Sequence, residues 1–177
     1  MEDAGYVFRV VIPEIKEVSH GGEAPEAYAI RMAQQKAGWV VEREGRDEIV
    51  LAADTVVVLD DLTLGKPRDE SDARQMLQRL SGRQHIVITG CCLSLPEPEG
   101  QTKLRTFQDG TRVWFRSLAE EEITAYIATG EPMDKAGAYA IQGGAAGFVE
   151  KIDGSFTNVV GLPMERVAAE LAHPIPS

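Results

Sequence analysis

One carboxylate, Asp54, interrupts the apolar stretch VLAADTVVVL. A buried carboxylate destabilises a fold by several kcal/mol unless water, an opposite charge or a metal ion compensates it. Asp54 is therefore a candidate for chemistry. The alternative is that the strand ends near Ala53 and Asp54 only caps or turns the chain, and hydrophobic periodicity does not separate the two interpretations.

Two other stretches place polar groups where the backbone can approach a ligand. In LTLGKPRDE, Lys66 lies between a glycine and a proline, which keep it out of a helix. In DKAGAYAIQGGAAGFVEKIDGSFTNVVGLP, recurring glycines alternate with polar residues that include Lys135 and Gln142. Such loops can turn backbone N–H groups toward an anion or a base. The alternatives are an ordinary lysine in a loop and a plain set of glycine turns.

Two further charged residues are weaker candidates. Glu17 follows an expected strand in PEIKE, where an acidic residue is usually just solvated. Lys36 shares the inward stripe of an expected helix with Ala29, Met32 and Ala33, so it does not lie on the outer face.

Several classes of chemistry are disfavoured by the residue pattern. Proline follows Lys66, so LGKP is not a Walker A loop. The three histidines have no ligand spacing and are expected to be structural or surface residues: His20, His85 and His173. Cys91 and Cys92 are adjacent inside an apolar run, which predicts reduced residues on a strand.

Composition indicates one globular domain over residues 1–177. Of the 177 residues, 44% are hydrophobic, and the formal net charge is -10 without a basic run. We expect no nucleic-acid partner, because the surface charge would repel a polyanion. No apolar stretch is long enough for a membrane span, and the first residues do not resemble a signal peptide, so we expect no membrane association and a cytoplasmic location.

Helical and strand patterns alternate along the chain, which predicts an α/β layered domain. An Asp109-Gly110 pair predicts a hairpin, and Ser117 with Glu120 predicts a capping box. A helix near Pro25 is expected to stop at Gly38. The expected strands are 6–12, 48–60, 85–95, 102–108 and 111–116, and the other expected helices are 69–82, 117–130 and one that begins after Leu162.

Seven motifs resemble, in order and at similar spacing, the Maf family of nucleoside triphosphate pyrophosphatases. They are IKE, AQQKA, AADTVVV, LGKP, MLQRLSGRQHIVITG, YIATGEPMDKAGAYAIQG and GSFTNVVGLPM. The resemblance implies hydrolysis between the α and β phosphates, with a divalent cation such as Mg²⁺ or Mn²⁺. AYAIQG resembles the dTTP/UTP branch, because the 7-methyl-GTP branch tends to carry glutamate at the position of Gln142. The family implies a mixed, twisted sheet flanked by helices, with two lobes around a nucleotide-binding cleft (Maf/Ham1 type, like inosine triphosphatases), and a homodimer.

The resemblance also implies roles for individual residues. Asp54 matches the catalytic acid, which orients or deprotonates water and helps to hold the metal together with Glu17. Lys36, Lys66 and Lys135 would offset phosphate charge, and Thr55 and Gln142 match positions that select the base.

The family pattern opens with a strand and a loop of the SxSxxR kind, and this sequence shows neither, so we expect an N-terminally shortened chain. Two alternatives stay open. One is a pyrophosphatase for other modified nucleotides, such as 7-methyl-GTP, and the other is a non-catalytic, nucleotide-binding regulator of growth or septum formation.

Overall fold

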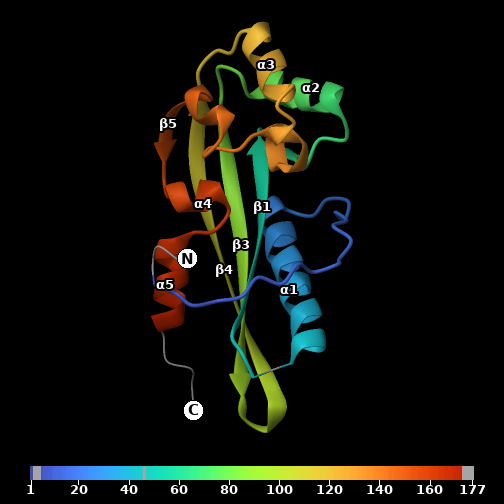
Figure 1. The fold of residues 1–177 in the computed structure, drawn as a ribbon, viewed down its shortest axis with the longest axis vertical. Helices are drawn as coiled ribbons and strands as arrows, with labels where there is room; N and C mark the ends of the chain where they lie inside the picture. Colours follow the sequence, from blue (N-terminus) through green and yellow to red (C-terminus); the bar gives the residue numbers. More distant parts are fainter. Residues whose placement is uncertain (2–4, 46, 173–177) are drawn as a thin grey trace. The chain divides into compact units, whose positions relative to one another are not determined.

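The computed structural model describes residue 1 and residues 5–45 and 47–172, which divide into two compact units. Unit 1 comprises Met1–Asp54, Gly90–Gln108 and Met164–Ser177, and unit 2 comprises Thr55–Thr89 and Asp109–Pro163. Helices and a five-stranded sheet make up the chain, which confirms the predicted α/β class (Figure 1). The single domain and the nucleotide-binding cleft stay predictions.

The strands follow the order β2-β1-β3-β4-β5. Pairing is antiparallel between β1 and β2, where Val57 faces Leu64, and between β4 and β5, where Val113 faces Ile152. The bounds are β1 (Val50–Leu59), β2 (Leu62–Leu64), β3 (Gln84–Glu97), β4 (Gln101–Phe115) and β5 (Val149–Asp153). The predicted strands 48–60 and 85–95 are confirmed as β1 and β3, whereas β2 and β5 were not predicted.

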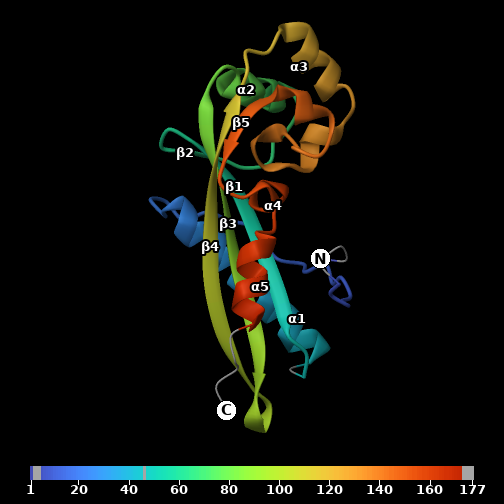
Figure 2. The same cartoon turned by 90° about the vertical axis from the view of Figure 1, so that its left-hand side faces the viewer.

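In unit 1, helices α1 (Pro25–Glu44) and α5 (Met164–Ala172) lie on opposite sides of the strands (Figures 1 and 2). Helix α1 packs directly on β3, since a Cβ atom at Gly90 would lie 2.4 Å from the backbone of Ala29. Its residues Ala33 and Ala37 form a core cluster with Cys92. Both cysteines are buried and free, as predicted. The missing side chain at Gly90 thus allows α1 to lie close to β3.

In unit 2, helices α2 (Glu70–Leu80) and α3 (Glu120–Ile127) pack side by side (Figure 1). The side chain of Asp69 accepts a hydrogen bond from the N–H of Asp72 and so caps α2. Edge-to-face aromatic contacts join Phe115, Tyr139 and Phe148 in the core. The other described helices of unit 2 are α4 (Phe156–Val160) and 3₁₀ helices at Glu131–Asp134, Ala136–Ala138 and Gly144–Phe148, whereas the 3₁₀ helix at Pro98–Gly100 belongs to unit 1.

Two predictions in the N-terminal part are wrong. Residues 6–12 form no strand, although all of them except Arg9 are apolar or aromatic, and Val7 and Ile12 are exposed. An extended segment becomes a strand only when a neighbour pairs with its backbone. Helix α1 does not stop at Gly38 but continues to Glu44, since burial of Val40 and Val41 outweighs the roughly 1 kcal/mol that glycine costs in a helix.

Two local predictions around β4 and α3 are also wrong. Strand β4 runs through Asp109 and Gly110 without a hairpin, because its two halves form one continuous strand of the sheet. The turn lies instead between β3 and β4, at Pro98–Gly100. The N-cap of α3 is Ala119, whose N–H donates to the carboxylate of Glu122, so the Ser117 and Glu120 capping box does not form. The final helix begins after Leu162, as predicted.

His85 is a structural residue, as predicted, and its Nε2 lies 2.7 Å from the hydroxyl oxygen of Tyr139. His20 is exposed, as predicted, and His173 lies outside the described residues. Among the described helices, none is long and apolar enough to cross a membrane.

Burial of His85 gives unit 2 a stability that depends on pH. Burial lowers the pKa of His85 from 6.5 to about 4. Below pH 6.5 the unfolded chain binds a proton that the folded chain excludes, so stability is lost as pH falls from 6.5 toward 4, by on the order of 3 kcal/mol. Urea unfolding at pH 7 and pH 4.5 checks this against His85→Gln, whose amide does not titrate but can still bond Tyr139. An equal loss in both proteins would contradict the prediction.

Candidate functional site

Three of the predicted site residues meet in unit 1. Lys36 Nζ lies 2.5 Å from Asp54 Oδ1 and 3.0 Å from Glu17 Oε1. Lys36 reaches them from the inward stripe of α1, Asp54 lies within β1, and Glu17 lies in the extended segment before α1. The Asp54 side chain is only 10% exposed. The alternative that the strand ends near Ala53 is therefore wrong.

Charge balance keeps Lys36 ionised in this partly buried position. Burial alone would lower the pKa of Lys36, but hydrogen bonds and charges from Asp54 and then Glu17 raise it above its usual value. The ammonium group compensates the carboxylate that the apolar strand brings into the interior. The two carboxylates thus converge on one cation.

This arrangement fits a hard divalent cation as well as an ammonium group. Mg²⁺ and Mn²⁺ prefer oxygen ligands, and Mg²⁺ is commonly held by one or two carboxylates with water and substrate phosphates as the other ligands. Within the part of the chain that the structure describes, no group of three or more His, Cys, Asp and Glu side chains could hold a metal. Glu17 and Asp54 are the pair on which a metal site would depend, together with oxygens from the substrate.

In unit 2, a backbone hydrogen bond joins the loops that carry Lys66 and Lys135. The N–H of Gly137 donates to the carbonyl oxygen of Gly65 at 3.0 Å. Lys135 Nζ lies 2.8 Å from both carboxylate oxygens of Asp134. Lys135 and, more weakly, Lys66 lower the pKa of Asp134, so both ammonium groups act on the same carboxylate. Two separate stretches of sequence thus form one cationic region.

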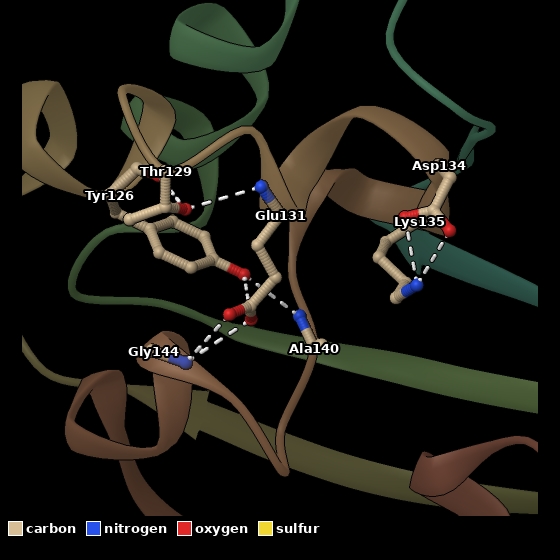
Figure 3. A network of polar contacts seen from close by, with 7 residues as sticks. All are labelled: Tyr126, Thr129, Glu131, Asp134, Lys135, Ala140 and Gly144. Carbon is tan, nitrogen blue, oxygen red and sulfur yellow. Dashed lines mark hydrogen bonds and ion pairs between the residues drawn. The ribbon is translucent and has the colours of Figure 1, made fainter.

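Gln142 is exposed and lies between Ala140 and Gly144 in the sequence. Figure 3 shows that Ala140 and Gly144 are both bonded to neighbouring side chains. The Tyr126 hydroxyl donates to the Glu131 carboxylate at 2.8 Å and accepts from the N–H of Ala140 at 3.1 Å. The same carboxylate accepts from the N–H of Gly144 at 3.0 Å. We call Tyr126 and Glu131 the loop clamp, because their partners lie two residues before and two residues after Gln142.

The loop clamp explains one of the glycines in the sequence AIQGG. A Cβ atom at Gly143 would lie 2.0 Å from Glu131 Oε1, so the carboxylate occupies the place of a side chain. The glycine next to Gln142 is therefore required by a close approach, not by flexibility.

Thr55, the last of the predicted site residues, bonds a residue that the sequence did not single out. Its Oγ1 lies 2.9 Å from Oγ1 of Thr89, and Thr89 Oγ1 donates to the main-chain oxygen of Asn158 at 3.2 Å. Thr89 and Asn158 are fully buried. Thr89 is a polar residue inside an apolar strand, and this pattern could have singled it out in the sequence. Nothing in the sequence indicates that it pairs with Thr55.

Removal of the Tyr126 hydroxyl should loosen the loop around Gln142. Tyr126→Phe leaves the N–H of Ala140 and the carboxylate of Glu131 each without one partner, so we expect a loss of about 1–3 kcal/mol in the free energy of unfolding. Urea denaturation measures it. Tyr28→Phe, which retains the ring contact with Arg31, is the matched control. Equal stability of Tyr126→Phe and the wild type would contradict the clamp.

Comparison with known proteins places the chain in one family. The model of the Maf-like protein family matches residues 1–173. A dTTP/UTP pyrophosphatase of Nitratidesulfovibrio vulgaris is 49% identical over 171 residues, which are 96% of this chain and 79% of that protein. A dTTP/UTP pyrophosphatase of Geobacter sulfurreducens is 50% identical over 172 residues, 97% of this chain and 87% of that protein. One from Bacillus cytotoxicus is 46% identical over 171 residues, 97% of this chain and 86% of that protein.

The chain belongs to the Maf family, which confirms the resemblance drawn from its motifs. The motif residues Glu17, Lys36 and Asp54 meet in unit 1, and the loops of Lys66 and Lys135 meet in unit 2. The roles of these residues and of Thr55 and Gln142 stay predictions.

Proposed function

We propose that this chain is a metal-dependent nucleoside triphosphate pyrophosphatase that converts dTTP and UTP to the monophosphate and pyrophosphate. The names of relatives that are 46–50% identical over nearly the whole chain support the substrate. The observation that carries the chemistry is the convergence of Asp54 and Glu17 on Lys36.

In the proposed reaction, a water oxygen attacks the α-phosphorus, and the bond from that phosphorus to the bridging oxygen breaks. Asp54 orients the water and takes its proton, and pyrophosphate leaves. The Lys36 ammonium donates to one oxygen of Asp54 and thereby fixes the direction of the carboxylate. The orientation of the base is thus set by a neighbour on α1, before substrate arrives.

Positive groups must offset the charge that develops on the phosphates. A divalent cation held by Glu17 and Asp54 would supply Lewis-acid stabilisation to the phosphate oxygens. Lys66 and Lys135 lie on loops that are bonded to each other, and we assign them to the phosphates and the leaving pyrophosphate.

Gln142 and Thr55 select the base in this proposal. The amide of Gln142 can donate and accept at the edge of a pyrimidine. Once a bound base covers the amide of Gln142, the loss of its hydrogen-bond partner on a wrong base costs about 1–3 kcal/mol, which corresponds to tenfold or more in selectivity. The loop clamp holds the backbone on both sides of Gln142, so the amide is presented from a fixed loop.

We further propose a cytoplasmic homodimer, the assembly that the family resemblance implies. Light scattering coupled to size-exclusion chromatography measures the mass of the assembly directly.

Replacement of Asp54 tests the proposed chemistry. Asp54→Asn keeps the size of the side chain but removes the base and a metal ligand, so we expect pyrophosphate release from dTTP and UTP with Mg²⁺ to fall by about 10²–10⁴-fold. Asp60→Asn is the matched control, because Asp60 pairs with Arg83 at the end of the same strand and its positive φ suits asparagine.

Activity of Asp54→Asn equal to that of the wild type would contradict the proposal. A folded wild-type protein that binds UTP without turnover would instead support the non-catalytic regulator. A higher kcat/KM for 7-methyl-GTP than for UTP would support the modified-nucleotide alternative.

A further inference from the structure

Thr55 is the end of a chain of polar groups inside unit 2. Its hydroxyl bonds the hydroxyl of Thr89 at 2.9 Å, and Thr89 in turn bonds the main-chain oxygen of Asn158 at 3.2 Å. Thr55 is partly exposed, whereas Thr89 and Asn158 are 0% exposed. The chain therefore runs from the interior to an accessible hydroxyl.

The direction of the hydrogen bonds in this chain follows from the last acceptor. A carbonyl oxygen can only accept, so the single hydroxyl proton of Thr89 is donated to Asn158. Thr89 then has no proton left for Thr55. In the hydrogen bond between the two hydroxyls, Thr55 must therefore be the donor and Thr89 the acceptor. The Thr55 proton thus points toward Thr89, and the Thr55 oxygen presents only lone pairs to a ligand.

The acceptor at the inner end of the chain is held firmly. Asn158 Nδ2 donates to the carbonyl oxygen of Val87 and to the hydroxyl of Thr111, both at 3.0 Å. The N–H of Asn158 donates to the hydroxyl of Ser155 at 3.2 Å. Since both the side chain and the backbone of Asn158 are bonded, its carbonyl oxygen cannot turn away from Thr89 without breaking other buried bonds.

Thr55 also has a neighbour without a side chain. A Cβ atom at Gly161 would lie 3.5 Å from Thr55 Oγ1, in van der Waals contact with the hydroxyl. Gly161 ends α4 with a φ of 114°, a conformation that L side chains rarely adopt. The backbone conformation therefore keeps side chains away from one side of the Thr55 hydroxyl.

We propose that Thr89 is a positioning residue for base selection, which fixes Thr55 as a hydrogen-bond acceptor toward the base. This inference rests on the proposed function, in which Thr55 contacts the pyrimidine. Thymine and uracil nucleotides have one N–H donor on the base, at N3, and cytosine has a lone pair there. An oxygen that can only accept a hydrogen bond binds the N3–H group of thymine and uracil. Its lone pairs repel the lone pair at N3 of cytosine. If Thr89 were absent, the Thr55 proton could turn outward and donate to cytosine.

The test is the ratio of kcat/KM for UTP to kcat/KM for CTP. Thr89→Val keeps the shape of the side chain and removes the hydroxyl, and we expect the ratio to fall about tenfold. Thr89→Ser restores the hydroxyl and should restore the ratio. Ser94→Ala is the matched control, because Ser94 is a buried hydroxyl on the same strand but outside the polar chain, and it should leave the ratio unchanged. Melting temperatures of all variants are measured alongside.

Two results would overturn the inference: a wild-type ratio in folded Thr89→Val, or a further drop when Thr89→Val is added to Thr55→Val, since Thr89 acts only through Thr55. Failure of the proposed function is recognised separately, by the absence of pyrophosphate release from UTP in the wild type. In that case calorimetry with the α,β-methylene analogues of UTP and CTP replaces the kinetic ratio. Equal wild-type affinity for the two analogues, or an affinity ratio unchanged in Thr89→Val, would then contradict the inference.

Discussion

The ion pairs of Lys36 with Asp54 and Glu17 are the interaction on which the site depends. Strand β1 continues through Asp54, so its pairing in the sheet holds a carboxylate at 10% exposure. Such a group needs an opposite charge, and Lys36 supplies it from α1. Helix α1 lies close enough only because Gly90 of β3 lets the backbone of Ala29 approach. Gly90 of β3 thus helps to bring Lys36 of α1 within reach of the Asp54 carboxylate on β1.

In unit 2, hydrogen bonds to buried or clamped polar groups hold the loops that carry the predicted site residues. The loop around Gln142 is rich in glycine, yet two of its N–H groups are bonded to Tyr126 and Glu131. Asn158 likewise bonds three partners from the interior. Hydrogen bonds between buried polar groups fix one arrangement of the chain, and within the Asn158 side chain only Oδ1 lacks a partner among the described residues. The loops are therefore preorganised, although their composition alone suggests freedom.

The sequence predicted what depends on local pattern. Asp54 stands out because a carboxylate interrupts an apolar strand, and the inward position of Lys36 follows from helical spacing. Family motifs then related both residues to phosphate chemistry. Long-range pairing was not predictable: no local pattern joins Glu17 to Lys36, Thr89 to Thr55, or Glu131 to Gly144. The wrong strand at 6–12 has the same cause, since a run of β-branched and aromatic residues favours an extended backbone but does not supply a neighbouring strand.

The affinity for a metal-nucleotide complex tests most directly whether Glu17 and Asp54, around Lys36, form the reaction centre. Calorimetry with the α,β-methylene analogue of UTP, with and without Mg²⁺, compares the wild type with Glu17→Gln. We expect Mg²⁺ to strengthen binding of the analogue to the wild type and Glu17→Gln to lose most of this gain, because one of the two carboxylate ligands is removed. The same gain from Mg²⁺ in both proteins would contradict it.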